Sequence, residues 1–173
     1  MRALYLLRHA KAVPQEESGP DRERALEKRG RRAAEAVAHW VAEHRIAPEL
    51  VLCSPSARTR QTLEIVAPAF PTPANMLFEE GLYLASAAQL LARLRRLEPE
   101  TQSVMLVGHN PGFHELATYL SEVVSGSLMA RLAGFPTGAL AQFETELPWS
   151  RLERKEARLV AVALPKQLIR GDE

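Results

Sequence analysis

The sequence predicts an α/β fold, a three-layer sandwich in which a mostly parallel central sheet carries helices on both faces. Short apolar runs alternate along the chain with segments of helical periodicity, which is the pattern of parallel strands joined by helical crossovers. The runs are apolar throughout, as in central strands that are covered on both faces. The chain has 173 residues and no repeat or linker-like tract, so a single domain is expected over residues 1–173.

The first apolar run, residues 3–7, is expected to form a buried strand that ends at Arg8-His9. A polar loop follows over residues 14–19, and residues 28–44 then have the spacing of a long amphipathic helix. Each later apolar run is predicted to be a strand of the same sheet. These strands cover residues 50–53, 75–78, 103–107, 139–144 and 158–164.

The remaining helices are predicted from the residues that open them. Ser54-Pro55 has the order of an N-cap followed by proline at the first helical position, so a second helix is expected to begin there. Ser86-Ala87-Ala88-Gln89 is a capping box that opens a third helix. Asn110-Pro111 repeats the order of cap and proline for a fourth helix. Residues 126–133 are expected to form a short helix that is ended by Gly134.

Composition excludes several classes of partner. Lys and Arg number 22 against 21 Asp and Glu, and this net charge of +1 gives no reason to expect nucleic acid or an anionic membrane as a partner. No apolar run approaches the roughly 18 residues that a membrane span needs. With one cysteine, Cys53, the chain cannot form an internal disulfide, and a cytoplasmic location is expected.

The sequence also gives no support for metal or cofactor chemistry. Asp21 and Asp172 are the two aspartates of the chain, and this scarcity argues against an aspartate nucleophile and against an aspartate-rich magnesium site. The histidines form no pair with the spacing of a zinc protease. No metal and no cofactor are therefore expected.

Two histidines stand at the ends of predicted strands. Arg8 and His9 follow the first strand, and His109 follows the strand over residues 103–107. Arg58 lies in the first turn of the helix that follows the second strand. In open α/β sheets, ligands bind beyond the carboxyl ends of the strands, where helix N-termini also favour anions. These residues therefore predict a phosphate site. The other histidines, His39, His44 and His114, are predicted to be surface or structural residues.

Cys53 raises an alternative nucleophile. Cysteine-dependent phosphatases have a Cys-x5-Arg loop between a strand and a helix, but Cys53 and Arg58 enclose four residues, and Cys53 and Arg60 enclose six. The spacing therefore fails in both cases. A small buried residue at a strand end accounts better for Cys53.

Several segments of the chain match, in order, the motifs of a known family. They are residues 6–12, 21–26 with Gly30, 54–62, 107–112 and 136–139. Together they resemble the histidine phosphatase superfamily, whose signature is Arg-His-Gly after the first strand, and more closely its branch of SixA-type phosphohistidine phosphatases. Two positions depart from the pattern, because Ala10 replaces the superfamily glycine and Ala25 stands where the branch usually has proline.

The resemblance implies a phosphoglycerate mutase-like fold and a phosphatase that needs neither metal nor cofactor. In the family mechanism, neutral His9 attacks phosphorus and becomes phosphohistidine, and water then releases phosphate. Arg8, Arg58 and a protonated His109 would neutralise the phosphoryl oxygens. Glu80 is the candidate proton donor, whereas the likeness to the SixA-type branch implies that a dedicated acid is absent.

Three functions remain open at this point. The first is a phosphatase for phosphohistidine in proteins, such as the transfer domains of phosphorelays. The second is a phosphomonoesterase for a small sugar or nucleotide phosphate. The third is a module that binds phosphoproteins without turnover. Short loops favour a protein substrate because they leave the pocket open, and the nucleophile His9 argues against binding alone.

Overall fold

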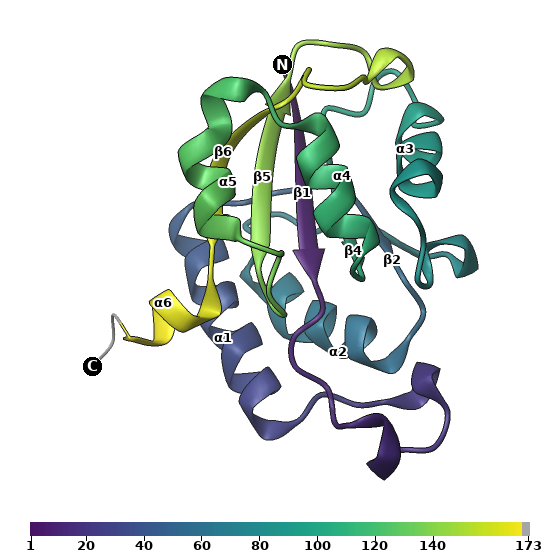
Figure 1. The fold of residues 1–173 in the computed structure, drawn as a ribbon, viewed down its shortest axis with the longest axis vertical. Helices are drawn as coiled ribbons and strands as arrows, with labels where there is room; N and C mark the ends of the chain where they lie inside the picture. The colour runs from purple at the N-terminus through teal and green to yellow at the C-terminus, as the bar shows by residue number, and fades with distance from the viewer. Residues whose placement is uncertain (171–173) are drawn as a thin grey trace.

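The central sheet of the protein has six strands within residues 1–170, which are the residues that the computed structural model describes (Figure 1). Asp172 lies outside the described residues. The strands are β1 (Arg2–Arg8), β2 (Leu50–Cys53), β3 (Asn75–Phe78), β4 (Ser103–Gly108), β5 (Leu140–Thr145) and β6 (Arg158–Ala163). The helices are α1 (Lys28–Glu43), α2 (Ala57–Val66), α3 (Ala87–Arg95), α4 (Gly112–Leu120), α5 (Gly126–Leu132) and α6 (Pro165–Arg170).

The sheet has the strand order β3-β2-β4-β1-β5-β6, and β5 is the reversed strand. The pairs β1–β4, β2–β4 and β2–β3 are parallel, whereas β5 is antiparallel to both β1 and β6. The prediction of a mostly parallel sheet is therefore confirmed. Leu7 and Cys53 both lie opposite Val107, so β1, β2 and β4 end at the same level.

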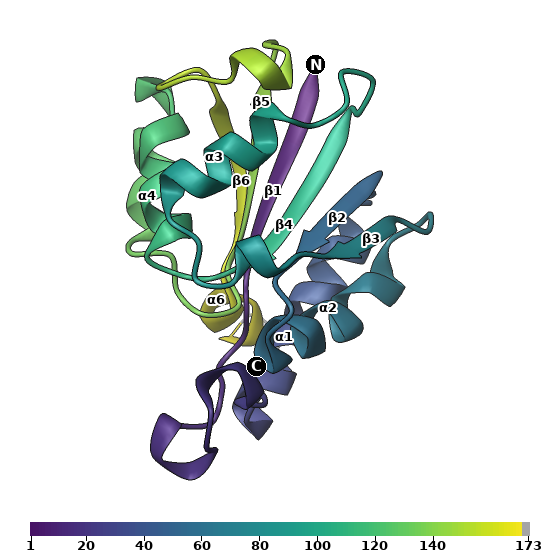
Figure 2. The same cartoon turned by 90° about the vertical axis from the view of Figure 1, so that its right-hand side faces the viewer.

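Helices cover both faces of this sheet, as the sequence predicts (Figures 1 and 2). Side chains of α1, α2 and α6 pack on one face, and side chains of α3, α4 and α5 pack on the other. Leu4, Leu6 and Leu7 of β1 are each at most 1% exposed. Because burial of one leucine side chain stabilises a fold by roughly 1.5–3 kcal/mol, the central strand is firmly anchored between the two layers.

The second helix begins later than predicted. Its N-cap is Ser56, whose Oγ accepts a hydrogen bond from the Thr59 N–H at 3.4 Å. Ser54 is instead a fully buried residue between strand and helix. The Ser-Pro pair therefore marks the approach to the helix and not its first turn.

Three other elements differ in detail from the predicted secondary structure. The fourth helix begins at Gly112, although Asn110 Oδ1 still accepts the His114 N–H at 3.1 Å. The polar segment over residues 14–19 contains a 3-10 turn at Gln15–Glu17. Helix α6 is not predicted by the sequence pattern, which continued the last strand to residue 164. No helix within residues 1–170 is long and apolar enough to cross a membrane.

Candidate active site

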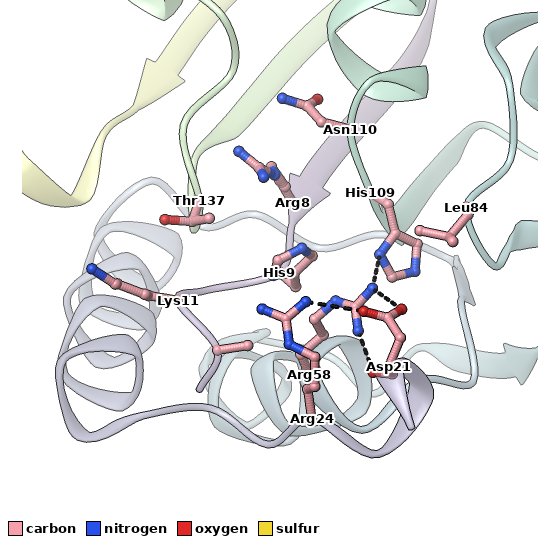
Figure 3. Close-up of a pocket in the computed structure, with 11 residues that line it drawn as sticks. Arg8, His9, Lys11, Asp21, Arg24, Arg58, Leu84, His109, Asn110 and Thr137 are labelled. Carbon is pink, nitrogen blue, oxygen red and sulfur yellow. Dashed lines mark hydrogen bonds and ion pairs between the residues drawn. The ribbon is translucent and has the colours of Figure 1, made fainter. Parts of the chain in front are cut away.

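The strands β1, β2 and β4 end beside a cavity of about 440 Å³, called here the strand-end cavity (Figure 3). It brings together four residues that the sequence predicts, although they are up to about a hundred positions apart. These four residues are Arg8, His9, Arg58 and His109. The cavity is completed by Lys11, Ala12, Asp21, Arg24, Leu84, Asn110 and Thr137.

His9 follows β1 and is only 8% exposed. The carbonyl oxygen of Ala10 lies 2.8 Å from Nδ1 and can only accept, so Nδ1 carries the proton and Nε2 keeps a free lone pair. Burial, reinforced by the positive charges of Arg8 and Arg58, lowers the pKa of His9 to about 3. At neutral pH this imidazole is therefore uncharged, and its Nε2 is available as a nucleophile.

The backbone at Ala10 tolerates the missing glycine of the superfamily signature. Ala10 is fully buried, and its N–H donates to Thr62 Oγ1 at 2.9 Å. The backbone φ angle of Ala10 is not positive, so an alanine side chain fits there without strain. The substitution therefore leaves the orientation of His9 intact.

His109 lies across the cavity from His9, with 5.4 Å between the ring centroids. Its Nε2 is 2.7 Å from Ser54 Oγ, and its Nδ1 is 3.4 Å from Arg58 Nη2. Burial, together with His9 and Arg58, lowers the pKa of His109 to about 3. The protein groups alone therefore keep the ring neutral, whereas the expected protonation of His109 concerns the ring beside a phosphoryl group.

Arg8 and Arg58 bring two guanidinium groups to the cavity with part of their hydrogen-bonding capacity unused. Arg58 is 3% exposed, and its Nη1 donates to the Asp21 carbonyl at 2.8 Å. Arg8 Nη1 donates to the Phe135 carbonyl at 2.9 Å. The Nε atoms of both arginines are buried and have no partner among the described residues. Both guanidinium groups line the cavity, so their remaining N–H donors can meet an anion that binds there.

Asp21 is a site residue that the sequence analysis did not identify. Its Oδ2 accepts from Arg58 Nη2 at 3.0 Å and also from the Tyr83 hydroxyl, and its Oδ1 accepts from Arg24 Nη1 at 3.0 Å. Burial acts in the opposite direction, but these three hydrogen bonds hold the pKa of Asp21 well below its usual range. Asp21 is therefore an anion that orients Arg58, and it cannot serve as a proton donor near neutral pH.

The structure does not bring Glu80 into the strand-end cavity. The Glu80 side chain is exposed, and its Oε1 accepts from Arg22 Nη2 at 2.8 Å. The hydrogen bond to Arg22 lowers the pKa of Glu80, which makes it a poor acid. The same segment reaches the site through Tyr83, whose ring packs edge-on against His109 with 5.5 Å between centroids.

Cys53 is placed as the sequence predicts, at the buried end of β2. Its Sγ donates to the Ser54 carbonyl at 3.2 Å, and burial raises the pKa of the thiol to about 12. A thiol with this pKa is not a nucleophile at neutral pH. Within residues 1–170, no group of three His, Cys, Asp or Glu side chains is placed to hold a metal ion.

The charges around the strand-end cavity suit a phosphoryl group. Four of the lining residues are cations, and Asp21 is the one acid among the described residues that line it. Arginine guanidinium groups bind two phosphate oxygens at once, and a desolvated cavity strengthens each such contact. A neutral imidazole nitrogen beside these cations can attack phosphorus.

Comparisons with known proteins agree with this geometry. Residues 4–82 match the family described as the Histidine phosphatase superfamily (branch 1). A structure assigned as the phosphohistidine phosphatase SixA from Agrobacterium tumefaciens is 33% identical, with a TM-score of 0.78 over 95% of this chain and 98% of that chain. One with the same assignment from Nakamurella multipartitia is 31% identical, with a TM-score of 0.78 over 95% and 96% of the two chains. An uncharacterized protein of Mycobacterium tuberculosis is 30% identical over 92% of this chain and 100% of its own length.

Proposed function

The chain belongs to the histidine phosphatase superfamily, in its SixA-type branch and with the phosphoglycerate mutase-like fold, and we propose that it hydrolyses the N–P bond of phosphohistidine in proteins. One observation favours the N–P bond over a phosphate ester as the bond that is cleaved. The carboxyl group that lines the strand-end cavity, Asp21, is held as an anion by Arg58, Arg24 and Tyr83. A phosphohistidine that is protonated on its second ring nitrogen releases neutral imidazole, whose conjugate acid has a pKa near about 6.5. Its departure therefore needs far less help from a protein acid than the departure of an alkoxide.

The reaction takes place in two displacements. In the first, His9 Nε2 forms a bond to phosphorus while the bond from phosphorus to the substrate imidazole breaks. The electron pair leaves with that imidazole, which departs neutral because its other ring nitrogen already carries a proton. The Nδ1 proton of His9 stays in its hydrogen bond to the Ala10 carbonyl, which stabilises the positive charge that develops on the ring. In the second, the water oxygen bonds to phosphorus as the bond to His9 Nε2 breaks and its electron pair returns to the ring. Phosphate leaves as dihydrogen phosphate with both protons of the water, and neutral His9 is restored. The reaction uses no metal.

The phosphoryl oxygens are bound by Arg8, Arg58 and His109. The guanidinium groups of Arg8 and Arg58, which line the cavity, supply donors for them. His109 Nδ1 accepts from Arg58 Nη2, so the neutral ring helps to hold the Arg58 guanidinium group against the phosphoryl oxygens. An incoming phosphoryl dianion also raises the pKa of His109, which adds positive charge where the transition state needs it.

A comparison of substrates tests the proposal. Phosphate release is measured from a phosphohistidine protein and from an alkyl phosphate ester, with wild type and with His9→Ala. The proposal predicts rapid N–P cleavage that the substitution abolishes, and slow ester cleavage. Faster cleavage of the ester would favour a small-molecule phosphomonoesterase instead. Binding of the phosphoprotein without turnover would favour a binding module.

A further inference from the structure

A second hollow lies beside the strand-end cavity and shares Lys11 and Thr137 with it. Figure 3 shows these two residues on the side of the cavity away from Leu84. The hollow has a volume of about 750 Å³ and is bordered by α1, α5 and α6, which lie on one side of the molecule in Figure 1. We call it the basic groove, after the cations that line it: Lys11, Arg29, Arg32, Arg131, Lys166 and Arg170.

The basic groove gathers positive charge, which acidic residues elsewhere in the chain balance. Six of the 22 Lys and Arg residues line it, and none of its described lining residues is Asp or Glu. The net charge of the whole chain is only +1. Within residues 1–170 neither Arg29 nor Arg32 forms an ion pair, and both are exposed. Lys11 differs, because its Nζ lies 3.7 Å from Glu27 Oε1. The groove therefore presents a local positive field to whatever approaches it.

The basic groove is held at a fixed position relative to His9. Helix α1 packs directly on the segment after β1, since a Cβ at Gly30 would lie 2.0 Å from the Lys11 carbonyl oxygen. Helix α6 packs on the residue after Thr137, since a Cβ at Gly138 would lie 2.9 Å from Pro165 Cγ. A ligand that fills the groove is therefore positioned with respect to the phosphoryl site.

The chemistry of the basic groove fits a protein surface better than a second phosphate group. Its six cations are exposed, five of them on three helices and Lys11 after β1, whereas the phosphoryl site uses the buried Arg58 and the half-buried Arg8. Apolar side chains lie between the cations, among them Leu164, Pro165 and Ile169. Mixed apolar and charged lining is typical of the rim of a protein interface.

We propose that the basic groove binds an acidic surface of the phosphoprotein substrate, next to the phosphorylated histidine. The proposal rests on the function proposed above and adds to it a class of partner. Acidic side chains of the substrate pair with the groove cations while the phosphohistidine enters the strand-end cavity. Charge pairs of this kind raise the rate of encounter and select the partner.

The test reverses four groove charges in one variant and leaves the residues of the strand-end cavity unchanged. Arg31→Glu, which reverses an exposed arginine of the same helix outside the groove, is the matched control. The substrates are a phosphohistidine protein with acidic side chains around the phosphorylated residue, the same protein with those acids replaced by amides, and phosphoramidate. The variant combines R29E, R32E, R131E and K166E.

We expect kcat/KM of the variant to fall by about tenfold or more with the acidic phosphoprotein, because several rim charges act together on encounter. Rates with the amide-substituted protein and with phosphoramidate should stay within about twofold, as should all rates of the control. The rate of wild type, but not of the variant, should fall steeply as salt is added. An equal loss with phosphoramidate, or no loss with the acidic protein, would overturn the proposal.

A binding measurement separates this proposal from the proposed function. If wild type cleaved no phosphohistidine substrate, the function would fail, and the basic groove would be judged by its affinity for an unphosphorylated acidic peptide. Affinity that the four-residue variant loses and Arg31→Glu retains supports the groove as an acidic-protein site. Unchanged affinity, or tighter binding of a single-stranded RNA oligomer than of the peptide, contradicts it.

Discussion

The Ser54 hydroxyl lies 2.7 Å from Nε2 of His109, and both side chains are buried. This contact fixes the orientation of the ring and leaves its Nδ1 towards Arg58. Because Arg58 can only donate, Nδ1 accepts from it, Nε2 carries the ring proton, and the Ser54 hydroxyl accepts that proton. Ser54 is therefore a positioning residue of the phosphoryl site, which acts through His109.

Replacement of Ser54 by alanine should lower kcat with a phosphohistidine protein by about tenfold, because His109 loses one of the two side chains that hydrogen-bond its ring among the described residues. Ser56→Ala is the matched control. It removes a helix cap and should lower the free energy of unfolding by about 1 kcal/mol while kcat stays within twofold. Equal losses of kcat in both variants would show that Ser54 acts only on stability.

Asp21→Asn should strengthen the binding of inorganic phosphate and at the same time lower kcat. The negative charge of Asp21 neutralises Arg58 and opposes an incoming anion, so its removal should lower the inhibition constant of inorganic phosphate by roughly three- to tenfold. The same change should lower kcat, since Arg58 loses an anchor. Tyr83→Phe keeps the charge and is the control. Weaker phosphate inhibition in Asp21→Asn would contradict this account of the pair.

The buried histidines predict a specific dependence of stability on pH. The pKa values of His9 and His109 are lowered to about 3, so below about pH 6.5 the unfolded chain binds protons that the folded protein does not. The contribution of these two histidines to the free energy of unfolding is therefore fully present above about pH 6.5. It falls as the pH drops towards 3, by up to about 1.4 kcal/mol per pH unit for each histidine. Denaturant unfolding between pH 7 and pH 4 should show a shallower fall for His109→Gln than for wild type. Parallel curves would mean that His109 is protonated in the folded protein.

Glu80→Gln should leave kcat/KM for a phosphohistidine protein within about twofold. Its carboxylate is exposed and paired with Arg22, and it does not lie among the residues of the strand-end cavity. The same assay with an alkyl phosphate ester completes the test, because an ester needs a proton donor more than an N–P bond does. A large loss with the ester alone would identify Glu80 as the acid after all.

The parts of the site that follow strands could be predicted, because apolar runs locate strand ends and parallel strands end on one edge. This reasoning found His9 and His109, whose strands are neighbours in the sheet. It also found Arg58 near the start of a helix, although Ser56 and not Ser54 caps that helix.

The residues that were missed lie where local pattern carries no signal. Asp21 belongs to a short 3-10 turn, and its partner Tyr83 is 62 positions away along the chain. In the sequence, Ser54 has the pattern of a helix cap. Its contact with His109 depends on the pairing of β2 with β4, which the local sequence does not show. Helix α6 was missed because the apolar run continues through Leu164 up to the proline that starts the helix.

Trapping the phosphorylated enzyme tests the central claim most directly. Wild type is mixed with a phosphohistidine protein, quenched within milliseconds at alkaline pH, and analysed by mass spectrometry of its peptides. We predict one phosphoryl group on His9, formed at least as fast as phosphate is released, and none in His9→Ala. Turnover without phosphorylation of His9, or a phosphoryl group on another residue, would contradict the account.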